Sequence, residues 1–195
     1  MSEKEQIAEV DTSLPSPGRL KKTIVMVGMM GAGKTAVGRA LAARLNVPFL
    51  DSDHEIESAA NMTIPEIFAR DGEPFFRRKE RQVIARLLTE ECGVLSTGGG
   101  AFLAAENRET ITRNGASIWL QADLDVLWNR VRHRDTRPLL KTADPRATLA
   151  ELYEARVPLY ALADLAVVSD GQASIEEMVD RVLEALQSRP DVLES

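Results

Sequence analysis

The stretch GMMGAGKT, residues 28–35, joins the apolar run KTIVMVG at residues 22–28 to the segment KTAVGRALAARLN at residues 34–46. The run predicts a buried strand, and the segment after it has the apolar spacing of a helix. The stretch itself satisfies the pattern G-x-x-x-x-G-K-[ST]. In this pattern backbone N–H groups enclose phosphates at a helix N-terminus, the lysine adds positive charge, and the hydroxyl can ligate Mg²⁺. The stretch therefore predicts a nucleoside triphosphate site.

The rest of the chain continues the alternation of strand and helix that begins here. Apolar runs with strand character recur as VPFLDSD, GVLSTGGG, ASIWLQA and DLAVVSD, and segments of helical pattern separate them. PRATLAELYEARVPLY reads as a helix as far as Pro158, and Ser174 is a good N-cap for the last helix. This order predicts an α/β fold with a five-stranded parallel sheet flanked by helices. Ligands of such sheets lie at the carboxyl ends of the strands, where GMMGAGKT, DSD and TGGG fall.

Length and composition predict a single domain with little affinity for nucleic acid or membrane. The chain has 195 residues and a net charge of -6, and its apolar runs are shorter than a membrane span. Cys92 is the only cysteine, which suits a reducing cytoplasm, and it reads as a buried thiol. The expected organisation is a disordered arm at 1–20, one domain at 21–188 and a flexible tail at 189–195.

Phosphate binding alone does not identify the phosphoryl acceptor. A switch GTPase needs Asn-Lys-x-Asp to read guanine, and the sequence has none. A motor or transporter ATPase ordinarily has an apolar strand that ends in aspartate, whereas the third strand here ends VLSTGGG. Another carboxylate must therefore help to hold the metal.

Asp51 and Asp53, in DSD, are the first candidates for that carboxylate. In an extended segment both would point to the same side, one toward Mg²⁺ and the other toward a substrate hydroxyl. Aspartate is also common where a helix begins, and DSDHEIE has that pattern. The residues alone leave both interpretations open.

Arginines and glycines supply the next candidates. Most charges of FFRRKER suit a solvated helix face, yet one arginine aimed into a cleft would match a carboxylate ligand. TGGG could bring backbone close to a ligand or could be a plain turn. The basic stretch NRVRHRDTRPLLKTADP predicts a mobile lid that closes an arginine over the phosphates, with an RNA-binding patch as the weaker alternative.

In this order GMMGAGKT, DSD, FRR, TGGG, TRPLL and ARVPLY resemble the shikimate kinase family over about residues 20–187. The resemblance implies a fold like that of the nucleoside monophosphate kinases. It also implies transfer of the γ-phosphoryl group of ATP to the 3-hydroxyl of shikimate, with Mg²⁺, in aromatic amino-acid biosynthesis.

The resemblance also implies a role for each matching residue. Thr35 and Asp51 are expected to hold Mg²⁺. Asp53 is expected to bind the reacting hydroxyl and to act as the base. Lys34 and Arg137 are expected to be catalytic residues that contact the phosphates. Among cations Asp53 should stay ionised. The expected ATP-binding residues are Gly31, Ala32, Gly33, Lys34, Thr35, Ala36, Arg130, Arg137 and Gln172. The expected substrate-binding residues are Asp53, Arg77, Gly98, Gly99, Gly100 and Arg156.

Two other functions remain as alternatives. A related kinase for gluconate or a nucleoside monophosphate would use the arginine pair differently, and turnover with those acceptors tests it. A non-catalytic sensor would usually lose Lys34 or Asp53, and this chain keeps both. For the assembly we expect a cytoplasmic monomer.

Overall fold

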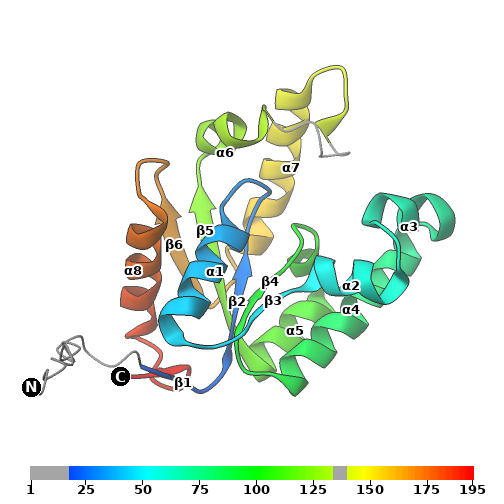
Figure 1. The fold of residues 1–195 in the computed structure, drawn as a ribbon. Coiled ribbons are helices and arrows are strands. Elements are labelled where there is room, and N and C mark those ends of the chain that lie inside the picture. The colour runs from blue at the N-terminus through cyan, green and yellow to red at the C-terminus, as the bar shows by residue number, and fades with distance from the viewer. Residues whose placement is uncertain (1–17, 134–139) are drawn as a thin grey trace, which may run out of the picture.

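The computed structural model describes residues 18–133 and 140–195, and a five-stranded parallel sheet forms its centre (Figure 1). The strand order is β3-β4-β2-β5-β6. The strands are β2 Thr23–Val27, β3 Phe49–Asp51, β4 Val94–Ser96, β5 Gly115–Ala122 and β6 Leu165–Ser169. Every residue of β2 is buried, as the central strand of a sheet covered on both faces requires. The predicted fold class is confirmed.

Helices cover both faces of this sheet. They are α1 Lys34–Leu45, α2 Ser52–Ala60, α3 Ile64–Asp71, α4 Glu73–Glu90, α5 Ala105–Asn114, α6 Leu124–Val131, α7 Pro145–Tyr160 and α8 Ile175–Leu186, with a short 3₁₀ turn, η1, at Ala101–Leu103. Helix α1 packs beside α8 and α4 beside α5, on opposite sides of the sheet (Figure 1). Ser174 caps α8 as predicted, in a capping box with Glu177.

Helix α7 corrects one boundary, because it continues through Pro158 to Tyr160. Proline removes one hydrogen bond to the carbonyl four residues earlier, here that of Glu154. Both residues are exposed, so water can satisfy that carbonyl. The extra turn places Tyr160 one helical turn beyond Arg156, on the same face.

The chain ends also differ from the prediction. Residues 1–17 of the expected arm lie outside the described residues, but Arg19–Leu20 form β1, which pairs antiparallel with β7 at Leu193–Glu194. The backbone N–H of Lys21 donates to the carbonyl of Val192 at 2.7 Å, and the Val192 side chain is buried. The segment 189–195 is therefore ordered, because it has both a strand partner and an apolar anchor.

Two further observations concern the surface. Cys92 is exposed, not buried as predicted, because it lies in the loop between α4 and β4. Among the described residues, no helix combines the length and apolarity needed to cross a membrane.

Candidate active site

The phosphate loop lies between β2 and α1, at the carboxyl end of the central strand. Gly33 precedes the first residue of α1 with φ 95°, and Gly31 has φ 81°, values that L side chains rarely adopt. Gly33 also offers no capping side chain, which leaves the first N–H groups of α1 available to an anion. Lys34 Nζ donates to the carbonyls of Gly28 and Met29 at 2.7 and 2.9 Å. The local geometry is that of an anion-binding turn.

A cavity of about 710 Å³ opens in front of this loop. Such a volume suits a nucleotide-sized ligand. The sequence-predicted residues that line it are Gly31, Ala32, Gly33, Lys34, Thr35, Ala36, Asp51, Asp53, Gly98, Gly99 and Arg130. The carboxyl ends of β2, β3, β4 and β6 all contribute, as expected for a parallel sheet.

Asp51 and Asp53 line the cavity in different local structures. Asp51 ends β3 and caps α2, since its Oδ1 accepts from the N–H groups of Asp53 and His54 at 3.0 and 3.1 Å. Asp53 lies in the first turn of α2, so the strand alternation used in the prediction does not extend past Asp51. The capping interpretation is correct for Asp51, and it does not remove that carboxylate from the cavity.

The electrostatics of Asp53 differ from the expectation that cations would dominate it. Burial raises the pKa of its carboxyl to about 6, and the neighbouring carboxylates of Asp51 and Glu80 add to the rise. Lys34 acts in the opposite direction but does not cancel these effects. Asp53 is therefore mostly ionised at neutral pH, yet close to the range in which it takes up a proton.

The glycine turn after β4 brings together three side chains from three helices. A Cβ atom built at Gly98 would lie 2.8 Å from Asp53 Oδ1, one at Gly99 would lie 2.9 Å from Arg156 Nη1, and one at Gly100 would lie 2.5 Å from Arg77 Nη2. None of these three glycines has a positive φ. Each of these glycines lets one side chain end approach the backbone where a Cβ would otherwise lie, so a larger residue would require that side chain end to shift.

The two arginines of this cluster are held differently. Arg156, on α7, is buried. Arg77, on α4, pairs with Glu80 at 2.9 Å and with Glu73 at 3.4 Å. The Glu80 side chain is almost fully buried, and burial raises the pKa of its carboxyl while Arg77 lowers it. The sequence pattern gave Glu80 no place in the predicted site.

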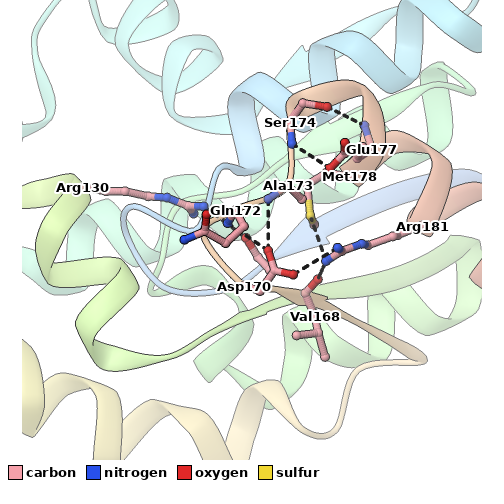
Figure 2. Close-up of polar contacts among 10 residues, drawn as sticks. Arg130, Val168, Asp170, Gln172, Ala173, Ser174, Glu177, Met178 and Arg181 are labelled. Atoms are coloured by element: carbon pink, nitrogen blue, oxygen red, sulfur yellow. Dashed lines mark hydrogen bonds and ion pairs between the residues drawn. The ribbon is translucent and has the colours of Figure 1, made fainter.

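The opposite end of the cavity is formed by α6 and by the loop between β6 and α8. Arg130 Nη1 donates to the carbonyls of Gly31 and Ala32 at 3.0 and 3.2 Å, and its Nη2 donates to Ser169 Oγ at 3.2 Å. Figure 2 shows Gln172 in the neighbouring loop, where its N–H donates to Asp170. Gln172 is exposed and Ala173 lines the cavity in its place.

Several residues of the site were missed by sequence reasoning. Ser96 and Thr97 line the cavity at the end of β4, and the hydroxyl of Tyr160 donates to the carbonyl of Gly99 at 2.5 Å. A spacing of four residues in ARVPLY, which puts Arg156 and Tyr160 on one helix face, was the available signal. Arg137 lies outside the described residues.

The residues present fit a magnesium ion. The Thr35 hydroxyl and the Asp51 carboxylate line one cavity with the phosphate loop, and both are the oxygen ligands that Mg²⁺ prefers. In the described part of the chain no cluster of three or more His, Cys, Asp or Glu side chains could hold a metal. The other ligands of a magnesium ion bound here would be water and nucleotide phosphate oxygens.

Fold and cavity together define a P-loop kinase that acts on a small molecule. The family model described as shikimate kinase matches residues 30–187. The chain is 75% identical over 175 residues to a shikimate kinase of Ruegeria pomeroyi, covering 90% of each chain, and 70% identical over 177 residues to one of Cereibacter sphaeroides, covering 91% and 88%. The chain belongs to the shikimate kinase family.

Solved structures agree with this membership. A shikimate kinase from Acinetobacter baumannii, in complex with shikimate, is 39% identical with a TM-score of 0.80, over 86% of this chain and 93% of that one. A gluconokinase from Sinorhizobium meliloti, at 21% identity and a TM-score of 0.58 over 87% and 94% of the chains, shares the fold alone.

Proposed function

We propose that this member of the shikimate kinase family transfers the γ-phosphoryl group of ATP to the 3-hydroxyl of shikimate, with Asp53 as the group that orients the hydroxyl and accepts its proton. The observation that carries the proposal is the position of Asp53. Its carboxylate lines the same cavity as the phosphate loop and touches the glycine turn on which Arg77 and Arg156 converge.

On the nucleotide side, the N–H groups of Gly31–Ala36 and the Lys34 ammonium hold the phosphates. Arg130 lines the cavity and holds the loop through the carbonyls of Gly31 and Ala32. We expect Gln172 to contribute on the adenine side and Arg137, which lies outside the described residues, to contact the phosphates. Phosphoryl transfer needs positioning and charge neutralisation more than covalent chemistry, and this set supplies both.

On the acceptor side, the guanidinium groups of Arg77 and Arg156 hold the shikimate carboxylate, and the glycine turn Gly98–Gly100 contributes backbone contacts. Asp53 then meets the ring from the side of the phosphate loop. A pKa of about 6 suits proton acceptance, because the carboxylate is charged at neutral pH and still basic.

Thr35 and Asp51 would hold Mg²⁺, which would supply positive charge against the phosphates of ATP. The capping bonds from Asp53 and His54 to Asp51 Oδ1 fix the orientation of that carboxylate.

The enzyme works as one domain, and we place it in the cytoplasm as a monomer. The exposed thiol of Cys92 suits a reducing compartment. Light scattering of the purified protein should give the mass of one 21.4 kDa chain, and twice that mass would contradict the monomer.

The test of the acceptor is a coupled assay with ATP and Mg²⁺ in which shikimate, gluconate and AMP are offered separately. We expect turnover with shikimate and background rates with the other two. Turnover with gluconate or AMP in place of shikimate would overturn the proposal.

The role of Asp53 is tested by Asp53→Asn, which keeps the shape and removes the base. We expect kcat to fall by at least about 10²-fold, the usual contribution of a positioned base. ATP binding, measured by calorimetry, should persist. The control is Asp125→Asn, which removes an exposed carboxylate that pairs with Arg146. Equal loss of turnover and ATP binding in Asp53→Asn would contradict the assigned role.

A further inference from the structure

The hydroxyl of Tyr160 is a buried polar group for which the proposed mechanism has no use. Tyr160 is fully buried at the end of α7, and its ring lies 6.3 Å from that of Trp119. Its hydroxyl donates to the carbonyl of Gly99 at 2.5 Å, and Gly99 lies 61 positions earlier in the chain. A buried polar group directed across the molecule in this way has either a packing role or a positioning role.

Two observations favour positioning. Arg156 lies one helical turn before Tyr160 on α7, and its Nη1 lies 2.9 Å from the position of a Cβ at Gly99. The Tyr160 oxygen lies 3.7 Å from the same position. Burial raises the pKa of the Tyr160 hydroxyl and the nearby Arg156 guanidinium partly offsets the rise, so the group remains a protonated donor at neutral pH. Arginine, hydroxyl and glycine peptide therefore form one contact cluster.

We propose that Tyr160 is a positioning residue for the shikimate carboxylate, whose hydroxyl fixes the Gly99 peptide relative to the Arg156 guanidinium. The inference deepens the proposed function and rests on it.

The physical reason lies in the freedom of the two partners. The Gly99 peptide has no side chain that could pack and restrict it, and an arginine guanidinium ends a flexible stem. A donor on the rigid phenol ring, wedged between Trp119 and the glycine turn, holds the peptide plane in one orientation. Removal of the hydroxyl would leave the Gly99 carbonyl without this donor, and the backbone N–H of the same turn could rotate away from the substrate.

The test is Tyr160→Phe, which preserves the ring and its packing. We expect the KM for shikimate to rise at least about tenfold, which corresponds to about 1.4 kcal/mol. The KM for ATP should stay within about twofold, because the tyrosine hydroxyl donates to the glycine turn. The kcat should fall far less than the shikimate KM rises. The matched control is Tyr153→Phe, the same change at the only other tyrosine, half-buried on the same helix.

An unchanged shikimate KM in Tyr160→Phe would overturn the inference. So would parallel losses for both substrates with a lowered melting temperature, because a packing role predicts that pattern. Failure of the proposed function would appear differently, as absent shikimate turnover in the unmodified enzyme and in both variants.

A second measurement does not depend on the stability of Tyr160→Phe. In the Tyr153→Phe background Tyr160 is the only tyrosine, so incorporation of 3-fluorotyrosine gives a single ¹⁹F signal. Shikimate should shift this signal in a saturable manner, since the carboxylate engages the Arg156 guanidinium beside the hydroxyl. A signal insensitive to saturating shikimate would overturn the inference.

Discussion

At the scale of single residues, the ionised carboxylate of Asp53 lowers the stability of the folded state, although the proposed catalysis requires it. Burial and two neighbouring carboxylates make its charge unfavourable in the folded state, which raises its pKa from 3.8 to about 6. The same location gives it access to both the phosphate loop and the glycine turn. A folded protein without this charge should therefore be more stable.

The corresponding prediction concerns Asp53→Asn at different pH values. The folded state binds the proton of Asp53 more tightly than the unfolded state, so stability from this group is present below pH 3.8 and lost as pH rises through about 6. At pH 8 the variant should exceed the unmodified enzyme in free energy of unfolding by about 1–3 kcal/mol. The gain should shrink toward pH 4.5, as measured by urea denaturation.

Asp125→Asn is again the control, because exposed substitutions usually change stability by less than about 0.5 kcal/mol. A gain that is equally large at both pH values would assign the effect to packing and not to charge.

At the scale of elements, the loop between β6 and α8 depends on a brace from α8. Arg181 Nη1 donates to the carbonyl of Val168 at 2.9 Å, and its Nη2 pairs with Asp170 Oδ2 at 3.1 Å (Figure 2). The other oxygen of Asp170 accepts from the N–H groups of Gln172 and Ala173 at 2.9 and 3.0 Å. These backbone contacts lower the pKa of Asp170. The brace shapes the cavity wall to which Ala173 belongs.

We predict that Arg181→Ala raises the KM for ATP by about three- to tenfold, since the contacts are exposed and each contributes modestly. The KM for shikimate should not change, because the glycine turn is formed by other elements. Steady-state kinetics with each substrate varied in turn measures both values. Arg86→Ala, which removes an exposed ion pair with Glu55, is the control. A change confined to shikimate would contradict the assignment of this loop to the nucleotide.

At the scale of the whole molecule, the two ends of the described chain close against each other. Strands β1 and β7 form a separate two-stranded sheet beside the central one (Figure 1). Val192, just before β7, is fully buried, and Arg189 links Asp191 and Asp164. The segment 189–195 therefore contributes to folding although it is remote from the cavity.

Val192→Ala should lower the free energy of unfolding by about 1–3 kcal/mol through lost burial and a residual cavity. The kinetic constants of the folded enzyme should be unaffected. Leu162→Ala removes a larger side chain that is 61% exposed, and it should change stability little. Equal stability of Val192→Ala and the unmodified enzyme in thermal denaturation would show that the segment is the flexible tail that its composition suggested.

Much of the fold could be predicted because its signals are local. The strand and helix around GMMGAGKT, the Ser174 cap and the polar ends of three strands depend on residues close together in sequence. The predicted end of α7 at Pro158 was wrong. The free-energy cost of a proline inside a helix depends on whether the carbonyl four residues earlier, here that of Glu154, can hydrogen-bond to water. The predictions of a buried Cys92 and of a flexible tail at 189–195 were wrong, because the exposure of a residue depends on which distant parts of the chain pack against it.

By itself the sequence determined the α/β order, the phosphate loop and the family motifs, since each is written in neighbouring residues or in one helical turn. Only the tertiary structure decided that the side chains of Asp53, Arg77 and Arg156 each lie against one glycine of the turn Gly98–Gly100. It also decided that the Tyr160 hydroxyl donates to the carbonyl of Gly99. At Asp53 it decided that burial raises the pKa of the carboxyl more than Lys34 lowers it. The reason is physical: a pKa and a positioned hydrogen bond depend on the distance between groups in space and on how much water separates them. Chain order fixes neither quantity before the sheet brings the ends of its strands together.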